Sequence, residues 1–147
     1  MSVVVGHVEA MYSQAEVNSK HLSSGEVMLR GQMDMQPGGP GGGTMSMSGD
    51  MSGMNMNGAS SSGNIRHLEV HICTASGSVV TDANPSIRLR DRTDGAVATV
   101  PVAVMQGVTS GSSDLHYGNN ISVTLGDSYV VDVALNGTSA TLPLPTF

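Results

Sequence analysis

The segment Tyr129–Leu144, YVVDVALNGTSATLPL, indicates how this chain folds. Between Tyr129 and Leu135, large apolar residues alternate with other residues, which is the period of a β-strand that has one face against a core. The dipeptide Asn136-Gly137 follows, and it favours a tight hairpin turn because both residues tolerate a positive φ angle. The segment therefore predicts two antiparallel strands joined by a β-hairpin.

The same pattern recurs along the chain, whose 147 residues are enough for one domain with its own core. Aromatic residues make up 3% and charged residues 12% of the sequence, so the core must be aliphatic. Only residues 14–20 are compatible with a helical turn. We predict an all-β fold, an antiparallel β-sandwich of about 7–9 strands that spans residues 1–147 as one domain. Further strands are expected at 3–12, 26–33, 65–74, 85–92, 96–105 and 121–125.

Residues 36–63, QPGGPGGGTMSMSGDMSGMNMNGASSSG, form a low-complexity segment of Gly, Ser, Asn and Met. Such a composition cannot bury enough apolar surface to offset the entropy of ordering, so we expect a long, flexible and disordered loop. Eight of the 11 methionines lie between positions 28 and 56, several of them as Met-x-Met. Thioethers are soft ligands that favour Cu(I), although a linker of adaptable side chains would have the same composition.

The charge and the cysteine content exclude several classes of protein. The formal net charge is −6, so the chain is a poor candidate for binding nucleic acid, whereas a negative potential suits cations. The single cysteine, Cys73, excludes an intrachain disulfide. No apolar run reaches the ~18 residues of a membrane span. The first residues lack the basic and long apolar regions of a signal peptide, so we expect a periplasmic or secreted protein in its mature form, with a cytoplasmic protein as the alternative.

The most informative polar pattern lies in residues 65–73, IRHLEVHIC. Alternate side chains of a strand share one face, so the apolar residues face a core and two imidazoles, a carboxylate and a thiol line the opposite face: His67, Glu69, His71 and Cys73. Neighbours in such a row are ~6.5–7 Å apart, so both His67 and Glu69 would reach an ion between them. The alternative is the solvated face of an antiparallel strand, and a lone cysteine is more often a small buried hydrophobic residue.

Two further candidate ligands are Met105, at the end of one predicted strand, and His116, just before another. The loop between them can return His116 toward the row that contains His67. An isolated loop histidine is otherwise a surface residue. Met33 and Met35, in a Met-Asp-Met run before the long loop, are further candidate ligands because thioethers bind soft ions.

Three parts of the sequence together resemble the periplasmic iron-transport protein family, which comprises dimeric copper-binding proteins encoded with iron-uptake permeases. They are VMLRGQMDMQP at 27–37, HLEVH at 67–71, and VM at 104–105 followed by DLHYGNNI at 114–121. The order and approximate spacing agree with the family pattern over residues 24–136, and His-Tyr-Gly-x-Asn-Ile is a fairly specific string. The chain differs in a longer Met-to-His gap, a larger Met-rich loop and the lack of a Gly-rich C-terminal stretch with another histidine.

This resemblance implies an immunoglobulin-like sandwich, a homodimer and a metal site formed by four residues: His67, Glu69, Met105 and His116. Copper, as Cu(II) or Cu(I), is the expected ion because the set mixes imidazole, carboxylate and thioether ligands, with iron or manganese as alternatives. Met35 matches a family methionine. The further candidate ligands are His71, Met35, Met33 and Cys73. A membrane permease is the partner that the family implies.

We therefore expect an extracytoplasmic metal-binding protein that takes part in copper or iron uptake or in metal delivery. The alternative is a metal-independent interaction module, in which Arg88, Arg90 and Arg92 on one strand face grip acidic groups. An enzyme is not expected. The sequence contains no Ser-His-Asp order with supporting loops, no phosphate-binding Gly loop and no paired catalytic carboxylates.

Overall fold

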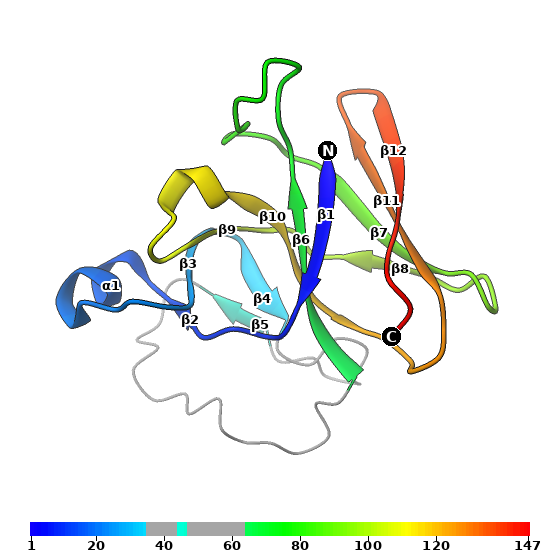
Figure 1. Cartoon of the computed structure of the whole chain (residues 1–147), viewed down its shortest axis with the longest axis horizontal. Coiled ribbons are helices and arrows are strands. Elements are labelled where there is room, and N and C mark those ends of the chain that lie inside the picture. Colours follow the sequence, from blue (N-terminus) through cyan, green and yellow to red (C-terminus); the bar gives the residue numbers. More distant parts are fainter. Residues whose placement is uncertain (35–43, 47–63) are drawn as a thin grey trace.

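The computed structural model describes residues 1–34, 44–46 and 64–147. It consists mainly of two β-sheets, one of six strands and one of four, which face each other as an open sandwich (Figure 1). The predicted all-β sandwich is therefore confirmed. Most of the predicted disordered loop, residues 36–43 and 47–63, lies outside the described residues.

The six-stranded sheet has the order β1-β6-β10-β9-β3-β2, and the four-stranded sheet has the order β12-β11-β7-β8. All neighbours are antiparallel except β2 and β3. The described residues contain more strands than the about 7–9 predicted, because β2, β4 and β5 are too short for their periodicity to be read. The strands are β1 (Ser2–Gly6), β2 (Met11–Tyr12), β3 (Glu26–Arg30), β4 (Gln32–Asp34), β5 (Thr44–Ser46), β6 (Ile65–His71), β7 (Ser86–Asp91), β8 (Val97–Val100), β9 (Ala103–Gly107), β10 (His116–Ser122), β11 (Tyr129–Leu135) and β12 (Thr138–Pro143).

Aliphatic side chains fill the space between the two sheets, as the composition predicts. Leu68 and Val70 of β6 belong to this core, which confirms the predicted alternation of that strand. Tyr117 of β10 is also fully buried there, and its hydroxyl donates a hydrogen bond to the Val80 carbonyl and accepts one from the Ala83 amide. The histidines and the glutamate of the same strands therefore emerge on the outer face of the six-stranded sheet, the face turned away from this core.

The turns and helices follow local sequence signals. Asn136 and Gly137 have φ angles of 50° and 79°, as the predicted hairpin between β11 and β12 requires. The helix α1 (Gln14–Lys20) coincides with the expected helical turn, and a capping box between Ser13 and Glu16 fixes its start. The 3-10 turn η2 (Gly111–Asp114) precedes β10. No helix in the described part of the chain is long and apolar enough to cross a membrane.

Candidate metal centre

The strand register brings the predicted histidines onto one face of the six-stranded sheet. On β6, where the apolar residues face the core, His67, Glu69 and His71 point to the outer face. β10 lies beside β6 with Asn120 opposite His67. Alternation along β10 then places His116 on the same outer face, two strands of the sheet away from β3. The polar row predicted from the sequence is therefore part of a side-chain cluster that spans several strands.

Glu26, the first residue of β3, completes a compact group with His67 and His116. Its Oε2 atom lies 3.3 Å from His67 Nε2, and its Oε1 atom lies 3.5 Å from His116 Nε2. The three residues are only 5%, 1% and 0% exposed, respectively, so water does not solvate them as it would a surface strand. One ligand atom from each residue lies within 4.8 Å of the other two, which is close enough for a single metal ion to contact all three.

The inward-facing atoms of this group lack hydrogen-bond partners. Glu26 Oε2, His67 Nε2 and His116 Nε2 are all buried and make no hydrogen bond, although they lie close to one another. The opposite ring nitrogens are engaged, because Nδ1 of His67 lies 3.1 Å from Asn120 Oδ1 and Nδ1 of His116 lies 2.9 Å from the Asp114 carbonyl. A carbonyl oxygen only accepts, so in the neutral form of each imidazole Nδ1 carries the proton and Nε2 presents a lone pair. This is the arrangement in which histidine binds a metal while its other nitrogen is held by an oxygen.

The charge balance at His116 favours a cation. Burial lowers the pKa of His116, but the adjacent Glu26 carboxylate, the Asp114 carbonyl and the charge of Glu69 together outweigh burial, so the pKa is raised. Two lone pairs and a carboxylate that converge in a dry site attract a positive charge. A proton or a metal ion supplies that charge, and the two compete for the same nitrogen.

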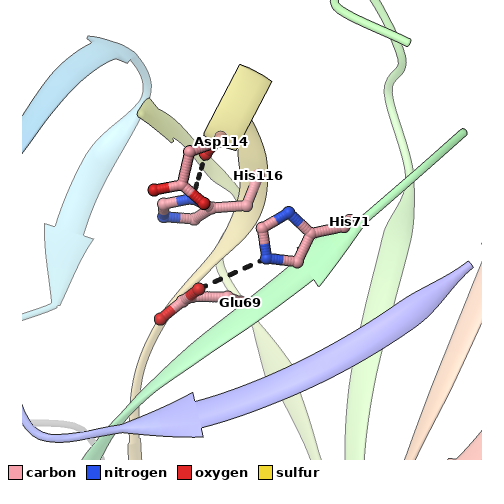
Figure 2. Close-up of side chains that lie close together, drawn as sticks. All are labelled: Glu69, His71, Asp114 and His116. Carbon is pink, nitrogen blue, oxygen red and sulfur yellow. Dashed lines mark hydrogen bonds and ion pairs between the residues drawn. The ribbon is translucent and has the colours of Figure 1, made fainter. Parts of the chain in front are cut away.

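A second, less buried group shares His116. Figure 2 shows Glu69 and His71 on β6 facing His116 and Asp114, which come from β10 and the turn before it. Nε2 of His71 lies 3.3 Å from Oε2 of Glu69, and this hydrogen bond lowers the pKa of Glu69 despite partial burial. One ligand atom from each of the four residues lies within 4.8 Å of the others, so this group could also hold an ion.

Two residues of β10 keep the neighbouring strands close to the site. A Cβ atom at Gly118 would collide with the carbonyl oxygen of Leu68, so glycine permits the close approach of β10 and β6. The side chain of Asn119 accepts a 2.6 Å hydrogen bond from the Asp34 amide and donates one of 2.7 Å to the Gln32 carbonyl. These bonds attach β4 to β10. The string that resembles the family motif therefore has a structural role at each of these positions.

The remaining predicted ligands differ in whether they lie near the cluster of Glu26, His67 and His116. Met105 is fully buried and lies directly across from His116 in the β9–β10 register. Met33 is also buried and packs in a cluster with Met105. Cys73 is exposed and belongs to neither group of candidate ligands. Met35 lies outside the described residues.

Sequence reasoning missed Glu26 and Asp114. The predicted strand at 26–33 would by alternation have placed Glu26 and Met28 on one face, which is the signal that was present. Nothing in the sequence, however, shows that this strand lies two positions from β10 in the sheet. Asp114 directly precedes the strand that begins at His116, and only the geometry of η2 returns its carboxylate to the imidazole.

The arginine face proposed as an alternative interaction surface is partly engaged within the chain. Arg90 on β7 donates two hydrogen bonds of 3.0 Å to the carboxylate of Asp132 on β11. These hydrogen bonds also lower the pKa of Asp132. An acidic partner would have to displace Asp132 before it could take both donors of Arg90.

The fold and the site together define a class of protein, an all-β sandwich with a buried His/Glu cluster that could hold a metal ion. No protein-family model, curated protein or solved structure matches the chain. The function therefore has to be argued from the chemistry of the site itself.

Proposed function

We propose that this chain is an extracytoplasmic metal-binding protein that carries a copper ion and takes part in copper or iron uptake or in metal delivery. The observation that carries the proposal is the convergence of three buried atoms that make no hydrogen bond, Glu26 Oε2, His67 Nε2 and His116 Nε2. Buried polar atoms in folded proteins normally have partners. Two imidazole lone pairs that face a carboxylate repel it unless a proton or a metal cation lies between them.

The ligand types support copper over the alternatives. Imidazole suits copper, zinc, iron and nickel, and the carboxylate of Glu26 neutralises part of a divalent charge. The thioether of Met105, directly across the sheet from His116, adds a soft donor that favours copper, which changes between Cu(II) and Cu(I). Iron and manganese remain the alternative ions, since both accept imidazole and carboxylate ligands.

The proposal is one of binding rather than catalysis. The three ligands are at most 5% exposed, which favours a protein that shields an ion over one that offers it to a substrate. The periplasmic or secreted location, the homodimer and a membrane permease as partner rest on the similarity of HLEVH and DLHYGNNI to the iron-transport family.

The test is thermal unfolding of the full chain with Cu(II), Zn(II), Mn(II) or Fe(II), each beside an EDTA control. We expect Cu(II) to raise the melting temperature by several degrees, because a ligand that binds only the folded state stabilises it. The double variant His67→Gln/His116→Gln should lose this shift. The matched control is His7→Gln/His21→Asn, which changes two exposed histidines and should keep it.

Either of two results would overturn the proposal. One is that no ion changes the melting temperature of the wild-type protein. This result would favour the alternative, a metal-independent interaction module that uses the arginine face of β7. The other is that the shift survives unchanged in the His67/His116 double variant, which would place the ion elsewhere in the chain.

A further inference from the structure

Methionine is distributed very unevenly between the two buried clusters of the described residues. The inter-sheet core contains no methionine among either its buried or its partly buried members. The smaller cluster on the outer face of the six-stranded sheet consists of Met28, Met33, Met105 and Ala103, with Met11 packed against it. If these flexible side chains served only to fill gaps, the larger core would be expected to use them as well. The buried methionines of the described residues are therefore concentrated on this face.

The strand register aligns two of these methionines with an imidazole. Met28 of β3 lies opposite Met105 of β9, and Met105 lies opposite His116 of β10. Directly opposed side chains share a face and have Cβ atoms about 4.5–5.5 Å apart. The three side chains are 1%, 0% and 0% exposed. A row of thioether, thioether and imidazole therefore crosses three adjacent strands in a dry environment.

Met33 adds a third thioether beside this row. It is 2% exposed and packs with Met28 and Met105, on the strand that the Asn119 side chain ties to β10. The imidazole at the end of the row presents an unsatisfied atom, because Nε2 of His116 is buried without a hydrogen-bond partner. Three buried thioethers thus pack together on the face that also presents the His116 imidazole.

We infer that Met28, Met33, Met105 and His116 form a second, soft metal site that takes a monovalent ion, Cu(I) or Ag(I). Thioethers are neutral and polarisable and need no deprotonation, so they select Cu(I), whereas the carboxylate and imidazoles of Glu26, His67 and His116 suit a divalent ion. An ion with a single charge also costs less to remove from water than one with two.

This inference deepens the proposed function, on which it rests through His116 and Met105. The divalent group and the thioether group share these two residues, so one copper ion uses one set of ligands or the other according to its oxidation state. Failure of the proposed function can be distinguished from failure of this inference. Glu26→Gln/His67→Gln removes donors of the divalent group alone, and Met28→Leu/Met33→Leu removes donors of the thioether group alone.

The experiment is a competition titration of Ag(I), and of Cu(I) without oxygen, against a chromophoric chelator, with Zn(II) titrated in the same variants. The low-complexity segment 36–63 contains five further methionines and Met35 precedes it, so the reference protein is the full chain with these six changed to Leu: Met35, Met45, Met47, Met51, Met54 and Met56. Met28→Leu/Met33→Leu is then made in that reference. Leucine keeps the apolar volume of methionine and removes the sulfur. The matched control is Met11→Leu, at the margin of the same cluster.

We expect the reference protein and the Met11 control to bind one equivalent of the monovalent ion with the same affinity. The Met28/Met33 variant should bind it roughly tenfold or more weakly, with Zn(II) affinity unchanged. The inference is overturned if the reference protein has already lost monovalent binding, or if the Met28/Met33 variant retains it in full. X-ray absorption of the Cu(I)-loaded reference protein gives a readout that does not depend on the variants, because a first shell without sulfur refutes the site.

Discussion

Replacing Glu26 by Gln tests metal binding independently of the stability of the fold. The carboxylate is 5% exposed, and its Oε2 atom has no hydrogen-bond partner. Glutamine has the same shape, and its NH2 group can donate to the lone pair on Nε2 of His67 or His116. At a pH above the raised pKa of His116, where that imidazole is neutral, we therefore expect metal-free Glu26→Gln to be as stable as the wild type or slightly more stable. Metal binding should weaken strongly, because the only anionic ligand of this group is lost.

The size of the effect follows from the linkage between binding and stability. Changing a residue that only orients a ligand costs about 10–100-fold in affinity, so loss of a ligand should cost at least about 100-fold. At a Cu(II) concentration of about 100 times the wild-type Kd, the wild type gains about 2.7 kcal/mol and the variant only about 0.4 kcal/mol. For a domain of this size, these values correspond to shifts in melting temperature of about 5–11 °C and about 1 °C.

The assay is differential scanning fluorimetry at that fixed Cu(II) concentration, with EDTA as the metal-free reference. Glu9→Gln is the matched control, because Glu9 is exposed and lies outside both groups of candidate ligands. A metal-induced shift in Glu26→Gln as large as in the wild type would refute the reasoning. So would a large loss of metal-free stability, since the carboxylate would then be a structural element rather than an unsatisfied ligand.

Three further predictions test the surroundings of the site. Asn120→Ala should weaken metal binding by about 10–100-fold in a chelator titration, because His67 loses the acceptor that orients it. Gly118→Ala should lower the unfolding free energy by more than about 2 kcal/mol in urea denaturation, because its Cβ would meet a carbonyl oxygen of β6. The raised pKa of His116 predicts that metal affinity falls as the pH decreases through that raised value, above the ordinary ~6.5. The stability of the metal-free protein has the opposite pH dependence, because protonated His116 pairs with Glu26. This added stability is full below pH ~6.5 and is lost as the pH rises through the raised pKa of His116. Melting curves recorded across this pH range will measure it.

Period-two alternation and turn chemistry were sufficient to predict the architecture. The hairpin at Asn136 and Gly137 and the inward-facing residues of β6 are local features, fixed by backbone preference and by the pleat of a strand. The short segments β2, β4 and β5 could not be predicted in this way, because two or three residues contain no readable period.

The site was predictable only where it lies along one strand. Alternation along one strand placed His67 and Glu69 on a shared face. Glu26 comes from β3, and its contact with His67 depends on the sheet order, in which β10 and β9 lie between β6 and β3. That order is a property of the whole fold. The sequence also could not show that the outer face is dry at His67 and His116, since a polar row reads the same whether water or other side chains cover it.

The pattern of unsatisfied atoms is the strongest reason to regard this face as functional. Among the described residues, the buried side-chain atoms without a hydrogen-bond partner belong to Glu26, His67, His116 and Asn120. Three of these residues contribute ligand atoms to one point, and the fourth orients His67. A folded chain tolerates unpaired buried polar groups poorly, and local departures from a consistent fold are expected where function requires them. Here the departures coincide in one cluster, next to buried methionines that the main core lacks. A cation at that point would satisfy both imidazole lone pairs and the carboxylate at once, and no single substitution to a neutral side chain could do the same.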